Sequence, residues 1–151
     1  EANPTVSFGI SPAGNNDNNY SQQYSDVKAW MATEGYVDYV MPQLYWGFDF
    51  RLAGGSDRFA FSNICTEWAA LPRAEGVRLF AGLAAYHVED QNDGGANSQA
   101  EWASGHILAD MVRHLRDTAG FSGFALFRHD SLFGSLSHAG AEIAALKEAL
   151  A

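Results

Sequence analysis

The chain has 151 residues, of which 47% are hydrophobic and 18% charged, values typical of a folded globular protein and not of a disordered or coiled-coil one. Its 18 acidic and 9 basic side chains give a formal net charge of -9, which argues against nucleic acid and anionic membrane surfaces as partners. Cys65 is the only cysteine, which excludes an internal disulfide and a cysteine-based zinc site.

The first half of the chain predicts two strands, each followed by a helix. TVSFGIS, Thr5 to Ser11, and DYVMPQLYW, Asp38 to Trp46, are near-continuously hydrophobic, as expected of parallel strands covered on both faces. The asparagine-rich run at 15–19 predicts a turn-forming loop, because Asn tolerates left-handed backbone. The apolar positions at helical spacing are Tyr24, Val27, Trp30 and Met31 for the first helix, which we expect to stop at Gly35, and Phe61, Ile64, Cys65, Trp68 and Leu71 for the second, which ends at Pro72.

The second half repeats this order. Strands are predicted over RLFAGLAAY, Arg78 to Tyr86, and GFALFRHDSL, Gly123 to Leu132. Ser98 and Glu101 predict a capping box, in which Ser98 accepts a hydrogen bond from the Glu101 amide and the carboxylate reaches back. The apolar helical positions that follow are Leu108, Met111, Val112 and Leu115, and then Ile143, Leu146 and Leu150, for which Ser137 is the expected N-cap.

Four strands alternating with four helices predict an α/β fold with parallel strands and right-handed crossovers. Two architectures accept four such units, a small open doubly wound sheet and half of an eight-stranded barrel. The segments after the strands are long and polar, whereas those before them are short, as on the active face of a barrel. A full barrel takes about 31 residues per unit, and this chain has roughly 38. We therefore predict a parallel (β/α)4 half of a (β/α)8 TIM barrel, with residues 1–151 as a single structural unit.

Pro42 lies inside the second predicted strand, where it removes a backbone hydrogen-bond donor. We expect a bulge or a lost hydrogen bond there that re-aims Gln43. The chain starts at Glu1 and not at Met, so we expect it to be a piece of a longer protein whose targeting segment lies outside it.

The carboxyl ends of four parallel strands meet on one rim, and polar and aromatic side chains gather at these ends. Rings stack on the apolar faces of sugars, amides and Arg bind hydroxyl groups, and carboxylates perform acid/base chemistry, so the rim has the composition of a carbohydrate site. Tyr45 and Trp46 could instead simply close the barrel end. No phosphate-binding or dinucleotide-binding glycine motif is present, and acidic loop residues are usually solvated, so we expect no metal and no other cofactor.

Four segments, FGISPAGNNDNNY, VDYVMPQLYWGF, LFAGLAAYHV and GFALFRHDSL, closely resemble the C-terminal half of the glycoside-hydrolase-like family 10 proteins. These are bacterial (β/α)8-barrel proteins classed with glycosidases, and the resemblance runs from about Val6 to Leu132. It implies that the predicted strands are the last four of the barrel and that the chain is the C-terminal half of a glycoside hydrolase acting on an oligo- or polysaccharide. It also implies an extracytoplasmic location, in the bacterial envelope or secreted.

In such proteins the first half of the barrel contributes acidic residues, for which this chain has no matching motif. Glycosidases need two carboxyl groups, so we expect the chain alone to be inactive. Within this interpretation Asp130 is the best catalytic candidate and Asp49 a weaker one, with Arg128 on the same strand face as Asp130 to orient the substrate. The expected sugar contacts are Asn15, Gln43, Tyr45, Trp46, Tyr86 and His87.

Two other functions remain open, a non-catalytic carbohydrate-binding module with a barrel-derived fold and a compact open-sheet interaction domain. A half barrel also leaves two strand edges unpaired and its inner face uncovered. We expect either a homodimer that completes a pseudo-barrel of four plus four strands or the missing N-terminal half of the same barrel to cover them.

Overall fold

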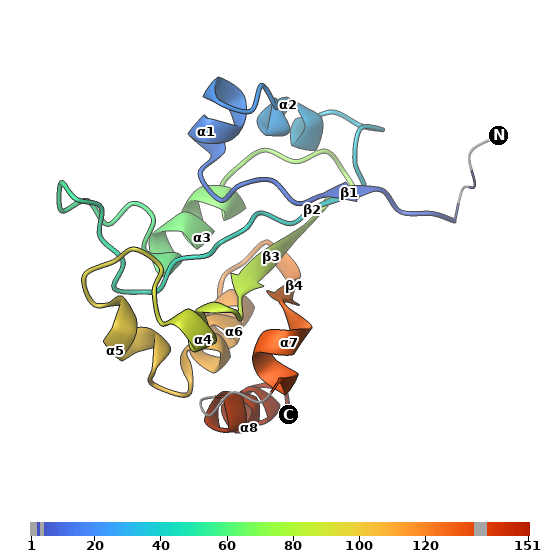
Figure 1. The fold of residues 1–151 in the computed structure, drawn as a ribbon. Coiled ribbons are helices and arrows are strands. Elements are labelled where there is room, and N and C mark those ends of the chain that lie inside the picture. Colours follow the sequence, from blue (N-terminus) through green and yellow to red (C-terminus); the bar gives the residue numbers. More distant parts are fainter. Residues whose placement is uncertain (1–2, 4, 135–138) are drawn as a thin grey trace.

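The computed structural model describes residues 3, 5–134 and 139–151. It has an α/β fold in which the strands of a parallel sheet alternate with helices along the chain (Figure 1). The four-stranded sheet has the order β1-β2-β3-β4, and all neighbouring strands are parallel. The strands are β1 (Gly9–Ile10), β2 (Tyr39–Val40), β3 (Arg78–Ala84) and β4 (Phe121–Phe127). The helices are α1 (Asn16–Ser21), α2 (Val27–Ala32), α3 (Phe61–Ala69), α4 (His87–Asp90), α5 (Ser98–Trp102), α6 (Ile107–Asp117), α7 (His129–Phe133) and α8 (Ala139–Leu150). This arrangement confirms the predicted half of a TIM barrel.

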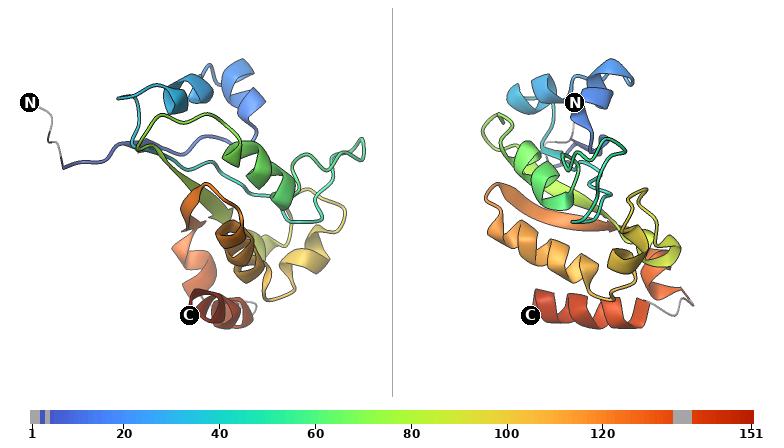
Figure 2. Two further views of the ribbon diagram at one scale, coloured as in Figure 1. Left: turned by 180° about the vertical axis from the view of Figure 1, so that it is seen from behind. Right: turned by 90° about the vertical axis from the view of Figure 1, so that its left-hand side faces the viewer.

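The helices pack on one face of the sheet. Leu79, Ala81 and Leu83 alternate along β3 and are fully buried, whereas on the opposite face Phe80 is only partly buried and Ala84 is fully buried. α6 packs beside β4, and α8 packs on the outer side of α6 (Figure 2). α1 and α2 lie at the opposite end of the molecule from α8. The face that carries Phe80 corresponds to the inside of a barrel, and no helix of the described chain covers it.

The predicted apolar stripes form the core. Ile64, Cys65 and Trp68 of α3 are fully buried, as are Met111 and Val112 of α6. The prediction for the first helix is partly wrong, because α2 begins only at Val27, where Asp26 accepts a hydrogen bond from the Ala29 amide. Tyr24 precedes this helix and is 90% exposed. No helix in the part of the chain that the structure describes is both long and apolar enough to span a membrane.

We predicted a loop for the asparagine-rich run, but this run forms the start of helix α1. The Asn15 side chain caps the helix by accepting hydrogen bonds from the amides of Asp17 and Asn18, which satisfies donors that a loop would leave to water. Asn19 is fully buried. Its side-chain oxygen accepts a hydrogen bond from the Ala13 amide at 3.0 Å, and its side-chain nitrogen donates to the Ala13 carbonyl at 2.8 Å. The run therefore fixes the segment that follows β1.

At Pro42 only the predicted loss of a backbone donor is seen. β2 ends at Val40, but backbone hydrogen bonds to both neighbours continue, from the Met41 amide to the Ile10 carbonyl and from the Gly82 amide to the Pro42 carbonyl, and Gln43 bridges Ala13 on one side and Gly82 on the other. The Gln43 amide donates to the Pro12 carbonyl at 2.9 Å.

Two other predicted boundaries are wrong. The last strand ends at Phe127, and residues 129–133 form α7 instead of continuing the strand. The capping box is absent because Asn97 is the N-cap of α5, and the Ser98 hydroxyl accepts instead from the Asp93 amide at 2.6 Å. The expected N-cap Ser137 of the last helix lies outside the described residues.

Candidate functional site

A cavity of about 350 Å³, here called the aromatic cavity, opens at the carboxyl ends of β1, β2 and β3. It brings together most of the predicted sugar contacts. Its lining residues are Ala13, Gly14, Gln43, Tyr45, Trp46, Tyr86, His87, Asn92 and Asp93.

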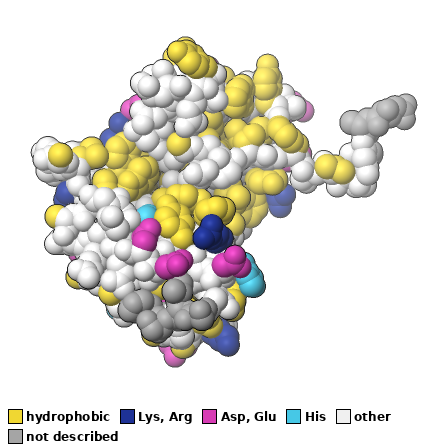
Figure 3. All heavy atoms as spheres, in the orientation of Figure 1, with side chains coloured by type: hydrophobic (Ala, Val, Ile, Leu, Met, Phe, Trp, Pro, Cys, Tyr) yellow, Lys and Arg dark blue, Asp and Glu magenta, His cyan; other side chains and the backbone are white. Residues whose placement is uncertain are grey.

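A second cavity, of about 370 Å³, adjoins the aromatic cavity at Tyr86, which lines both. It is also lined by Glu89, Asp90, Phe127 and Arg128. Hydrophobic side chains gather near the middle of the face shown in Figure 3, with acidic and basic side chains at their border. The rim therefore combines apolar ring surface with hydrogen-bonding groups.

Three aromatic rings form a connected group between the two cavities. The Tyr45 ring stacks on Phe127 with centroids 6.2 Å apart and meets Tyr86 edge to face at 5.7 Å. Burial and the proximity of Tyr86 raise the pKa of Tyr45, and burial and the charge of Asp90 raise the pKa of Tyr86. Both phenols therefore stay protonated at neutral pH and can donate hydrogen bonds.

Trp46 contacts both Phe59 and Gly14 at the rim. Its ring stacks on Phe59, with centroids 4.9 Å apart and an interplanar angle of 19°. At Gly14 a Cβ atom would come within 2.7 Å of the Trp46 ring and 2.4 Å of the Gln43 carbonyl oxygen. Only glycine fits there, and its absent side chain lets the segment after β1 lie against the ring.

Two carboxylates, here called the carboxylate clamp, bind the backbone just after Trp46. Asp93 accepts from the Gly47 amide at 2.8 Å and from the Trp102 indole at 3.0 Å. Glu101 accepts from the amides of Phe48 and Asp49. A Cβ atom at Gly47 would lie 2.0 Å from the Glu101 carboxylate, so the clamp needs glycine at this position.

The pKa values of the two clamp carboxyl groups are shifted in opposite directions. Burial acts to raise the pKa of Asp93, but hydrogen bonds from Trp102, Gly47, Gly95 and Ser98 outweigh burial and hold that pKa below its usual range. Burial raises the pKa of Glu101, and the nearby charges of Asp49 and Asp93 add to the rise, whereas the bound amides offset it only in part. Asp93 is therefore a fixed anion in the aromatic cavity.

His87 is 7% exposed and lies in the wall of the aromatic cavity. Its Nδ1 is 2.7 Å from Asp90 Oδ1, and its ring lies between Tyr86 and Trp102, at centroid distances of 4.2 and 5.0 Å. The carboxylate and the two rings fix the orientation of the imidazole.

Three predicted site residues lie elsewhere. Asn15 uses its side chain to cap α1. Asp49 lines a different cavity, of about 340 Å³, together with Glu101, His106 and Asp110. Asp130 lies in α7 with its side chain 85% exposed, so the expectation that Arg128 and Asp130 share a strand face is wrong. Among the described residues that line the two rim cavities, neither Asp49 nor Asp130 appears.

Sequence reasoning missed Asn92, Asp93 and Phe127 as lining residues and did not select Glu89 and Asp90 from the rim. The Asp-Gly step at 93–94 is a turn signal, and it could have marked Asp93 as a residue whose side chain binds backbone amides. In the described part of the chain no three His, Cys, Asp or Glu side chains are grouped so that they could hold a metal ion.

Comparison with known proteins identifies relatives of the chain. The family model described as "Glycosyl hydrolase-like 10" matches residues 1–104. The chain is 32% identical over 107 residues to glycosyl hydrolase YngK of Bacillus subtilis (strain 168), a match covering 61% of this chain and 20% of that protein. It is 27% identical over 146 residues to glycosyl hydrolase DigH of Escherichia coli (strain K12), covering 85% of this chain and 31% of that protein. The chain thus spans less than a third of the length of these relatives.

Proposed function

Because the chain belongs to the glycosyl hydrolase-like 10 family, we propose that its rim forms part of the glycan-binding and glycan-cleaving site of a glycoside hydrolase. The observation that carries the proposal is the aromatic cavity, in which Tyr45, Trp46 and Tyr86 adjoin the amides of Gln43 and Asn92. Exposed ring faces bind the apolar faces of pyranoses, and amides bind their hydroxyl groups.

The carboxylates near the rim differ in what they can contribute. Asp93 is bound by several donors and serves as a fixed anion. Asp90 is paired with His87. The carboxylate of Glu89 is exposed in the second cavity and makes no hydrogen bond or ion pair with another described residue. Of the described residues, we therefore favour Glu89 over the sequence-based candidates Asp130 and Asp49 as the acid that this chain supplies.

Hydrolysis needs a second carboxyl group about 5–10 Å from the first, depending on whether the reaction retains or inverts configuration. We propose that the second group comes from outside this chain and that the chain alone binds glycans without cleaving them. This second group would approach the inner face of the sheet, where Phe80 is partly exposed and Phe127 is 53% exposed.

The second candidate function is a non-catalytic carbohydrate-binding module. It is favoured by one observation, that neither of the predicted acids, Asp130 and Asp49, lines the aromatic cavity. Such a module would keep the sugar-stacking surface and lack the paired acids.

The test is a panel of neutral polysaccharides, assayed for binding and for hydrolysis with the longest natural protein that contains this chain. Tyr86→Ala should weaken binding about tenfold through loss of a stacking ring, whereas Tyr36→Ala, at an exposed tyrosine away from the rim cavities, should not. Loss of turnover in Glu89→Gln with retained binding supports the hydrolase, and binding without any turnover supports the module. No binding to any glycan on the panel would contradict both.

A further inference from the structure

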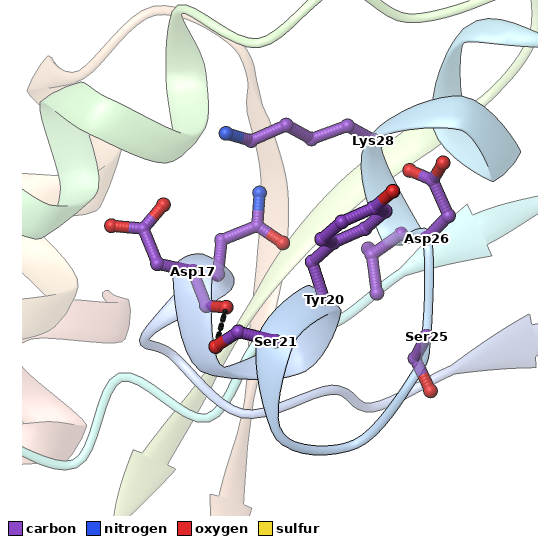
Figure 4. A pocket seen from close by; sticks show the side chains of 8 residues that line it. Asp17, Tyr20, Ser21, Ser25, Asp26 and Lys28 are labelled. Carbon is purple, nitrogen blue, oxygen red and sulfur yellow. Dashed lines mark hydrogen bonds between the residues drawn. The ribbon is translucent and has the colours of Figure 1, made fainter.

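A separate cavity of about 310 Å³, here called the α1–α2 cavity, lies between helices α1 and α2 (Figure 4). It shares no lining residue with the aromatic cavity, although the segment from Ala13 to Asp17 connects the two. Its lining includes Asn16, Asp17, Tyr20, Asp26, Val27 and Lys28. At this size a cavity takes a small ligand.

Asn16 lines this cavity with an amide that the protein does not satisfy. The residue is 3% exposed, and its Nδ2 has no hydrogen-bond partner among the described residues. Its Oδ1 accepts a long hydrogen bond of 3.4 Å from Asn19. A buried donor without a partner is costly, so a ligand oxygen that reached Nδ2 would gain a hydrogen bond that the free protein lacks.

The charged side chains that line the cavity are Asp17, Asp26 and Lys28, which leave one excess negative charge. Asp17 forms an ion pair with Arg58 at 2.7 Å, which lowers the pKa of Asp17, but Arg58 is shared with Glu67 at 2.8 Å. Lys28 and Asp26 then contribute one charge of each sign, and one Asp26 oxygen already accepts from the Ala29 amide. In Figure 4 the Lys28 amino group extends above the Tyr20 ring toward the side of Asp17, and Asp26 lies on the other side of the ring. A site with both donors and acceptors and one excess negative charge disfavours an anionic ligand and fits a neutral ligand with several hydroxyl groups.

Aromatic surface is exposed at the same place. Tyr20 lines the cavity and is 67% exposed, and Val27 beside it is 1% exposed and supplies an apolar floor. An amphipathic ring that remains as open as that of Tyr20 suits stacking on a sugar.

We propose that the α1–α2 cavity is an accessory subsite that binds a single residue of a neutral sugar. Tyr20 supplies the stacking face, Asn16 and Lys28 donate to ring or hydroxyl oxygens, and Asp26 accepts from a hydroxyl group. The choice of sugar as the ligand class rests on the function proposed for the rim. The subsite would hold a part of the glycan that is remote from the bond to be cleaved.

The test is a titration of the ¹⁵N-labelled protein with glucose, N-acetylglucosamine and cellotetraose, followed by NMR. The reporters are the Asn16 side-chain amide and the backbone amides of 16–28 for the subsite, and the Trp46 indole for the rim. We expect the subsite signals to shift with at least one of these neutral sugars. Tyr20→Ala should weaken that response about tenfold, and the control Tyr36→Ala should leave it unchanged.

The two proposals fail separately in this experiment. Shifts at 16–28 without any at Trp46 would support the subsite and count against the rim. Shifts at Trp46 with none at 16–28 would overturn the subsite and leave the rim standing. A response at 16–28 that is stronger for the charged probes glycine or glucuronate than for the neutral sugars would also overturn it.

Discussion

At the scale of single residues, the rim depends on backbone amides that are bound by carboxylates. Glu101 and Asp93 hold the amides of Gly47, Phe48 and Asp49, the residues that directly follow Trp46. Because these bonds join segments 46 to 53 residues apart, they tie the loop after β2 to helix α5 and the loop before it. The two carboxylates therefore position Trp46 through the backbone that follows it.

Glu101→Gln tests this clamp through pH. The folded-state pKa of Glu101 is raised above its usual 4.5, so its contribution to stability is fully present below about pH 4.5 and is lost as the pH rises through the folded-state pKa. Glutamine keeps an acceptor oxygen but does not titrate. We expect the fall in unfolding free energy between pH 4.5 and 7 to be shallower in the variant, measured by urea denaturation.

The control for this experiment is Glu75→Gln, at an exposed glutamate, which should leave the slope unchanged. Some slope should persist in Glu101→Gln, because burial also raises the pKa of Glu142, which titrates in the same direction. A variant with the full wild-type slope would contradict the assignment of Glu101.

Gly14→Ala tests the packing beneath Trp46. The added methyl group would collide with the Gln43 carbonyl oxygen and the Trp46 ring, and the carbonyl belongs to the backbone and cannot turn away. We expect a loss of about 1–3 kcal/mol in unfolding free energy and weaker glycan binding. At Gly54 a Cβ atom would meet nothing within 4 Å, so Gly54→Ala is the matched control and should change neither property.

At the scale of helices and strands, the end of one helix is capped by another. Glu142 of α8 is fully buried, and its Oε1 accepts from the Leu108 amide at the start of α6 at 2.6 Å. His106, the N-cap residue of α6, provides no side-chain cap of its own. The carboxylate thus satisfies a helix-terminal donor and joins α6 to α8.

Removing this cap should destabilise the protein. Glu142→Ala leaves the buried Leu108 amide without an acceptor and creates a small cavity, for which we expect a loss of about 2–4 kcal/mol in unfolding free energy. Glu148→Ala, on the exposed side of the same helix, should cost less than about 0.5 kcal/mol. Equal losses in chemical denaturation would show that the contact contributes nothing.

Helices and strands could be predicted from the sequence where the pattern that marks them lies in neighbouring residues. The stripes of α3 and α6 were predicted because 3.6-residue periodicity marks a buried helix face, and the missing donor at Pro42 follows from the residue type alone. The end of the last strand was missed because α7 has only 5 residues, too few to show periodicity. The carboxylate clamp was missed because its bonds join residues far apart in sequence, and Glu101 was therefore assigned to a local capping box.

At the scale of the whole molecule, the sheet has one covered and one uncovered face. β1 and β4 are its outer strands, each with a single neighbour in the described chain. Phe127 at the end of β4 is 53% exposed on the inner side, next to Tyr45. Exposed aromatic surface and unpaired strand edges favour association.

We expect the isolated chain to form a homodimer through this face. Phe127→Asp should shift the mass measured by size-exclusion chromatography with light scattering toward the monomer, and Phe133→Asp, at a 63% exposed phenylalanine of α7, should not. The net charge of -9 on each copy opposes association, so the dimer should strengthen as salt is added. A well-folded monomer at micromolar concentration would contradict this prediction and favour the other half of a barrel as the partner.

The proposed binding of glycans in the aromatic cavity can be tested through the Trp46 indole N–H signal, in a ¹⁵N NMR titration with cellotetraose and other neutral oligosaccharides. The indoles of Trp68 and Trp102 serve for comparison, because they are buried and donate to Gly14 and Asp93, which line the cavity. We expect a saturable shift of the Trp46 signal that is weakened about tenfold by Tyr86→Ala, with smaller changes at the two buried indoles. A Trp46 signal that stays in place with every oligosaccharide would contradict it.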